Sequence, residues 1–67
     1  MQITFNGEII ETTENKPLSN LLSEKNLLAK NGIAIALNSK VIPKLKWDTT
    51  LLNNNDKILV ITATQGG

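Results

Sequence analysis

The segment Lys57–Thr62 limits the possible folds more than any other part of the chain, because its four central residues are all apolar. In a strand, Ile58 and Val60 lie on one face. Leu59 and Ile61 then lie on the opposite face. A strand that is apolar on both faces is typical of the middle of a sheet. We therefore predict a central strand with the first pair beneath a helix and the second pair partly exposed.

The small size of the chain restricts how it is stabilised and what it does. A chain of 67 residues forms one domain, which buries only about 60% of the surface that its unfolded form exposes. The absence of Cys and His excludes a disulfide framework and the common zinc sites. So few apolar residues cannot both fill a core and line a deep cleft. We expect ordinary packing, no bound metal, and a protein that is not itself an enzyme.

Charge and hydropathy restrict the partners. Seven Lys face six acidic residues and there is no Arg, which argues against a nucleic-acid partner held by phosphate contacts. No apolar run approaches the ~20 residues of a membrane span, and the start at Met1–Phe5 lacks the pattern of a signal peptide. We expect a cytoplasmic protein that binds neither nucleic acid nor membranes.

The first half of the chain predicts a hairpin and a helix. Gln2–Phe5 alternates polar and apolar residues, Asn6-Gly7 favours a tight turn, and Glu8–Glu11 follows as the second strand. Pro17 suits the start of a helix, and Asn31-Gly32 suits its end. The apolar residues between them share one side at helical spacing, and they are Leu18, Leu21, Leu22, Leu28 and Ala29.

The second half predicts another hairpin before the last strand. Ile33–Leu37 alternates large and small apolar residues and ends at Asn38-Ser39, before Val41-Ile42 and Pro43. Residues 48–52 are expected to form a helical turn.

Two other features of this half are read as structural. Asp56, after the Asn run, is expected to form a turn rather than to act as a catalytic acid. Trp47 is expected to pack in the core, although with Lys44 and Lys46 it could also suggest a nucleic-acid patch.

This order of elements fits an α+β domain in which one helix crosses a mixed sheet. We predict a ubiquitin-like β-grasp fold with four to five strands over residues 1–63. Residues 64–67 are expected to form a flexible C-terminal tail, because Thr64-Gln65-Gly66-Gly67 offers no apolar side chain for docking.

The terminal glycines point to chemistry at the Gly67 carboxylate. Without a Cβ, Gly66 and Gly67 can enter a narrow tunnel in a partner and leave the terminal carbonyl open to attack. A carboxylate is a poor electrophile, whereas an acyl-adenylate made with ATP has a good leaving group. The site residues are therefore predicted to be Gly67 with Gly66 and Gln65 beside it, and sulfur could be added there.

Several short motifs along the whole chain carry a family resemblance. They are Met1-Gln2-Ile3 with Phe5-Asn6, Leu21-Leu22, Ile35-Ala36-Leu37-Asn38, Val41-Ile42-Pro43 with Trp47, Asp56 before Ile58, and Gly66-Gly67. In this order the chain resembles the ThiS family, the ubiquitin-like sulfur carriers of thiamine biosynthesis. Lys44 is a departure, because family members often have Arg after this Pro and a bidentate contact there would be lost.

The resemblance implies a carrier that serves as a protein cosubstrate. A ThiF-like adenylyltransferase of the ubiquitin-activating type would use ATP to adenylate Gly67. A cysteine desulfurase pathway would supply a persulfide and leave a C-terminal 1-thioglycine, the thiocarboxylate form of Gly67. The sulfur would pass to a ThiG-like thiazole synthase. No cofactor would be bound by the carrier itself.

Other functions remain open at the level of sequence. The carrier of molybdopterin synthesis shares the Gly-Gly end, and a ubiquitin-like modifier would use the same activated Gly67 to form isopeptide bonds. A non-covalent binding module would use only its sheet. We expect Leu59 and Ile61 to contact the activating enzyme, because exposed apolar patches mark partner surfaces; loops that cover both faces of the strand are the alternative.

Overall fold

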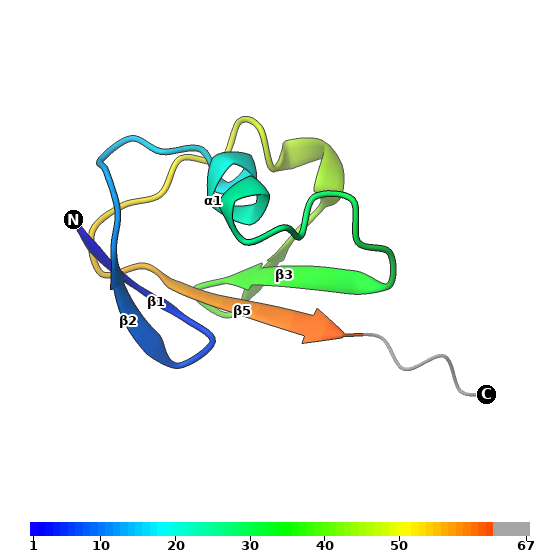
Figure 1. Ribbon diagram of the computed structural model, residues 1–67, viewed down its shortest axis with the longest axis horizontal. Helices are drawn as coiled ribbons and strands as arrows, with labels where there is room; N and C mark the ends of the chain where they lie inside the picture. Colours follow the sequence, from blue (N-terminus) through cyan, green and yellow to red (C-terminus); the bar gives the residue numbers. More distant parts are fainter. Residues whose placement is uncertain (63–67) are drawn as a thin grey trace.

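The computed structural model describes residues 1–62 as an α+β domain, in which one helix lies across a five-stranded mixed sheet (Figure 1). The elements in chain order are β1 (Gln2–Phe5), β2 (Glu8–Glu11), α1 (Leu18–Glu24), β3 (Ile33–Leu37), β4 (Lys40–Ile42), the 3₁₀ helix η1 (Lys44–Lys46) and β5 (Lys57–Thr62). The predicted α+β, β-grasp architecture is confirmed.

The last strand occupies the centre of the sheet, as its apolar pattern predicts. The strand order is β2-β1-β5-β3-β4. β5 runs parallel to β1 and antiparallel to β3, and the two hairpins are antiparallel. The chain therefore joins the hairpins through β5, and residue 63 follows directly from the central strand.

Both predicted hairpins form, and both turn through left-handed residues. Asn6 and Gly7 have φ values of 51° and 82°, and Asn38 and Ser39 have values of 51° and 71°. Positive φ at both central residues is the geometry of the two-residue turn that matches strand twist. In the first turn a Cβ on Gly7 would meet no atom within 4 Å, so glycine is favoured there by its backbone conformation and not by a lack of space.

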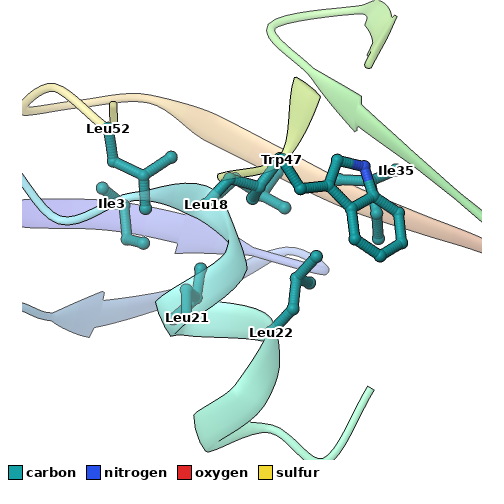
Figure 2. Packing of buried hydrophobic residues seen from close by; sticks show 8 residues of the cluster. Ile3, Leu18, Leu21, Leu22, Ile35, Trp47 and Leu52 are labelled. Atoms are coloured by element: carbon teal, nitrogen blue, oxygen red, sulfur yellow. The ribbon is translucent and has the colours of Figure 1, made fainter. Parts of the chain in front are cut away.

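The core lies between α1 and the inner face of the sheet. Figure 2 shows Leu18, Leu21 and Leu22 of α1 pointing toward side chains of the sheet and of the connecting segments. The buried cluster consists of Ile3, Leu18, Leu21, Leu22, Ile35, Trp47, Leu52 and Ile58. No disulfide reinforces this thin core, because the chain has no cysteine.

The helix is shorter than predicted, and the assignment of Leu28 and Ala29 to its buried face is wrong. α1 ends at Glu24, and Asn26 adopts a left-handed conformation with φ of 60°. The Leu27 N–H donates to the Leu22 carbonyl at 2.8 Å, and the Asn26 N–H donates to the Ser23 carbonyl at 3.0 Å. These two bonds form a Schellman motif, which stops the helix about six residues before Asn31-Gly32.

The position predicted for the helical turn is also wrong. A 3₁₀ turn forms at Lys44–Lys46 instead of residues 48–52, because Pro43 begins it and the Lys46 N–H donates to the Pro43 carbonyl at 2.8 Å. The Thr50 hydroxyl then donates to the Lys46 carbonyl at 2.6 Å. Leu51 pairs with Pro17 in an isolated bridge, which keeps this segment extended. Within residues 1–62, no helix has the length and apolarity needed to cross a membrane.

Candidate interaction face around the central strand

The three predicted residues of the C-terminal chemistry, Gln65, Gly66 and Gly67, lie outside the described residues, as does the whole of the predicted 64–67 tail. The structure instead describes the strand that leads to them. Thr62 ends β5 opposite Ile33, at the start of β3. The geometry around β5 therefore determines which surfaces a partner meets beside the C-terminal residues.

The outer face of β5 carries the predicted apolar pair. Leu59 is 44% exposed and Ile61 is 43% exposed, whereas Ile58 is fully buried and Val60 is partly buried. The predicted division of the strand is confirmed, and the alternative in which loops cover both faces is wrong. That these two side chains contact a partner stays a prediction.

Neighbouring strands extend the apolar surface on this face. Ala36 lies between Leu59 of β5 and Val41 of β4, and Ala34 lies beside Ile61. Val41 is 57% exposed. Ala36 is only 8% exposed, because it lies between the larger side chains of Leu59 and Val41. We call Leu59, Ile61, Val41 and the two alanines the outer apolar face.

Val41 is a member of this face that reading the sequence did not single out. The sequence does indicate an apolar outer face at Ile33–Leu37, where every second residue is an alanine. Alanines on the face opposite the buried Ile35 indicate a strand whose outer side is flat and apolar. The sequence does not give the register of β3 with β4, and only this register places Val41 beside Ala36.

The beginning of β5 is fixed by a buried carboxylate. Asp56 is 7% exposed, and its two oxygens accept the Asn53 N–H at 2.7 Å and the Asn38 side-chain amide at 2.9 Å. The Asn38 side-chain carbonyl in turn accepts the Lys57 N–H at 2.9 Å. Asp56 thus forms the predicted turn and also ties that turn to the β3–β4 hairpin.

A second side chain holds the middle of β5. The Val60 N–H donates to the side-chain carbonyl of Asn6 at 2.8 Å, and the Asn6 N–H donates to the Ile58 carbonyl at 2.9 Å. The turn residue Asn6 therefore takes the place that the next residue of β1 would occupy in the ladder. The β1–β2 hairpin has turned away from the sheet at this point.

Trp47 packs in the core, as predicted. The alternative, a nucleic-acid patch, is wrong because it requires an exposed aromatic ring. Its indole is buried, and the indole N–H donates to the Ile42 carbonyl at 2.9 Å. The Lys44 ammonium lies 5.9 Å from the ring centroid. A buried ring cannot stack on bases, so Trp47 and Lys44 support the β4–η1 corner.

A groove of about 330 Å³ lies beside this corner. Its lining includes Lys30, Ile33, Ile42, Lys44 and Trp47, and no carboxylate or hydroxyl side chain takes part in it. Among residues 1–62 no cluster of three His, Cys, Asp or Glu side chains is placed to hold a metal.

Comparison with known proteins agrees with this architecture. A family model described as the ThiS family matches residues 3–67. The chain belongs to the ThiS family. The Sulfur carrier protein ThiS of Escherichia coli is 27% identical over 67 residues, and the match covers both chains completely. The uncharacterized protein ycf40 of Porphyra purpurea is 33% identical over 67 residues, which cover 93% of its length.

Solved structures support the fold independently. The crystal structure of the thiamine biosynthesis protein ThiS from Geobacter metallireducens superimposes with a TM-score of 0.86 at 23% identity, and each chain is fully covered. The solution structure of a thiamine biosynthesis protein from the same organism gives a TM-score of 0.75 at 23% identity and is covered over 88% of its chain. At this identity the likeness establishes the shared β-grasp fold of the family.

Proposed function

We propose that this chain is a sulfur carrier in thiamine biosynthesis and that its Gly67 carboxylate carries the sulfur. The observation that carries the proposal is membership of the ThiS family, whose model extends through residue 67. The E. coli relative, named as a sulfur carrier, matches over the full length of both chains.

The first step is activation of the carboxylate by a partner. An oxygen of the Gly67 carboxylate attacks the α-phosphorus of ATP, and pyrophosphate leaves. The product is an acyl-adenylate, in which AMP is the leaving group. A ThiF-like adenylyltransferase supplies the ATP site, so the carrier contributes the nucleophile and the surfaces that deliver it.

The second step exchanges AMP for sulfur. The terminal sulfur of a persulfide, generated by a cysteine desulfurase pathway, attacks the acyl carbon and AMP leaves. A thiol of the donor system then attacks the remaining S–S bond, which releases the thiocarboxylate and forms a disulfide on the donor. The thiocarboxylate holds its charge largely on a soft, nucleophilic sulfur, which a ThiG-like thiazole synthase accepts as 1-thioglycine at Gly67.

The outer apolar face is the proposed docking surface for the adenylating enzyme. Leu59 and Ile61 stay about half exposed in the strand that leads to the C-terminal residues. Val41 adds a third exposed apolar side chain beside them. Burying these side chains against an apolar partner surface removes them from water, which favours association.

Intact-mass measurement tests this function. The purified chain is incubated with ATP, a ThiF-like adenylyltransferase and a persulfide donor, and replacement of one oxygen by sulfur at Gly67 is expected. The matched control lacks Gly66 and Gly67 and is expected to keep its melting temperature and to gain no sulfur. Sulfur transfer by this truncated chain would contradict the proposal. Covalent conjugates with other proteins on a denaturing gel would instead favour a ubiquitin-like modifier.

A further inference from the structure

The sheet is incomplete beside the second half of β5. β1 pairs with β5 only through Thr4 and Phe5, which lie opposite Lys57 and Ile58. On the other side, β3 pairs with β5 at five consecutive positions, out to Thr62. Figure 1 shows β5 extending past the tip of the β1–β2 hairpin. Among residues 1–62, no strand therefore flanks β5 beyond Ile58 on the β1 side.

The register identifies the backbone groups on this open side. In an antiparallel ladder, alternate residues direct their N–H and C=O toward the partner strand and the others direct them away. The Asn38 N–H donates to the Lys57 carbonyl at 2.8 Å, which assigns the odd-numbered residues of β5 to β3. The backbone groups of Ile58, Val60 and Thr62 therefore point toward the β1 side.

Asn6 satisfies two of these groups. It donates its N–H to the Ile58 carbonyl and accepts the Val60 N–H through its side chain. Beyond it, the Val60 carbonyl and both backbone groups of Thr62 have no strand beside them in the described part of the chain. These two carbonyls and one N–H are spaced as in a β-strand. Another extended backbone can pair with such a row of groups.

We infer that this open edge, Val60–Thr62, binds an extended backbone segment of the adenylating enzyme, which adds to the sheet as a short strand. The inference rests on the proposed function. Five residues separate Thr62 from the end of the chain, and they span at most about 17 Å. Backbone pairing at Thr62 would thus fix the point from which Gly67 reaches the ATP site.

The short length of the edge favours an enzyme over a second copy of this chain. Two or three strand bonds alone are insufficient for a stable association, since isolated strand pairs are marginal in water. An enzyme that also covers the outer apolar face supplies the additional buried surface. Ile61 links the two sites, because its side chain belongs to that face while its neighbours Val60 and Thr62 form the edge.

A proline at position 62 tests the edge selectively. Thr62→Pro removes the N–H that points to the open side and leaves the β3 ladder bonds of Ile61 in place. Thr62→Ala is the matched variant, because it also loses the hydroxyl and keeps the N–H. With the full chain and a ThiF-like adenylyltransferase, kcat/KM for ATP–pyrophosphate exchange is expected to be about tenfold lower for Thr62→Pro than for Thr62→Ala. Thermal unfolding of both variants verifies their folding.

If Thr62→Pro does not fold, an amide-to-ester replacement of the Ile61–Thr62 peptide bond removes the same N–H without a ring and is expected to give the same loss. Equal rates for proline, ester and alanine variants, with an active wild-type chain, would overturn this inference and leave the proposed function intact. An inactive wild-type chain would overturn both. A wild-type dimer in solution that Thr62→Pro dissociates would assign the edge to a second copy and also overturn it.

Discussion

The two faces of β5 carry the same kinds of side chain in very different surroundings. Ile58 is fully buried beneath α1, while Leu59, the next residue, is 44% exposed. Val60 packs against the core, and Ile61 is again exposed. The comparison shows that apolar character alone does not tell which residues stabilise a small domain. The side of the strand decides this, and the other side stays available to a partner.

The largest effect should come from truncating the inner face. Ile58→Ala removes a fully buried side chain from a thin core, and the free energy of unfolding is expected to fall by about 2–5 kcal/mol. Urea denaturation followed by far-UV circular dichroism measures this loss. A domain of this size is marginally stable, so part of the variant population is expected to be unfolded even without urea.

Leu59→Ala is the matched control for this prediction. Its side chain is already about half exposed, so the loss is expected to be about 1 kcal/mol or less. Equal losses for the two variants would mean that the faces do not differ energetically, and the comparison would fail.

The next largest effect concerns the buried carboxylate at the start of β5. Asp56→Ala leaves the Asn53 N–H and the Asn38 amide without their acceptor. Stability is expected to fall by about 1–3 kcal/mol, because buried donors lose their partner. Asp48→Ala, at an exposed acidic position, is expected to change stability by less than about 0.5 kcal/mol. Thermal unfolding of the two variants tests whether burial makes this difference.

Periodicity and turn residues were sufficient to predict the two hairpins, the central last strand and its two faces. Asn6-Gly7 and Asn38-Ser39 specify their turns through local backbone preferences. The alternation from Ile58 to Ile61 assigns each side chain of β5 to one face of the sheet without reference to other strands. The outer apolar face was only half predicted, because Val41 joins it through the β3–β4 register. The open edge was not predictable, since it depends on where β1 stops relative to β5.

The next largest effect concerns binding, which is expected to depend on the outer face of β5 and not on the inner face. Leu59→Glu places a charge on the outer apolar face, and the KM of the carrier in adenylation is expected to rise at least about tenfold, which corresponds to about 1.4 kcal/mol. Ile61→Glu is expected to act in the same way. The free energy of unfolding should change much less than in Ile58→Ala, because water still reaches both positions. Steady-state kinetics and urea denaturation on the same preparations separate binding from folding.

Ile9→Glu is the control for a charge placed on the same side of the sheet but away from the outer apolar face. Ile9 is 68% exposed and lies opposite Thr4, on the far side of β1 from β5. The KM of the Ile9→Glu variant is expected to stay within about twofold of the wild-type value, which corresponds to less than about 0.5 kcal/mol. A KM increase as large as that of Leu59→Glu would show that the whole outer side of the sheet repels or excludes the enzyme when charged, without a local docking face.

The smallest effect concerns the end of α1, which comes earlier in the chain than the sequence predicts. The helix predicted between Pro17 and Asn31-Gly32 includes Asn26, although Asn tolerates the left-handed conformation that ends a helix. Ala lacks that tolerance, so Asn26→Ala is expected to lower stability by about 1 kcal/mol. Asn26→Gly is expected to match or exceed the wild type, because glycine adopts positive φ without steric conflict.

Asn20→Ala separates this conformational effect from the loss of an amide. Asn20 lies in the first turn of α1 and is exposed. Ala is the better helix former, so stability is expected to stay equal or rise by a few tenths of a kcal/mol. Thermal unfolding of the three variants gives the ranking. If Asn26→Ala were as stable as Asn26→Gly, the left-handed residue would not determine where α1 ends. Packing of Leu27 on the core would then have to stop the helix, since Leu27 is the next residue held against the buried cluster.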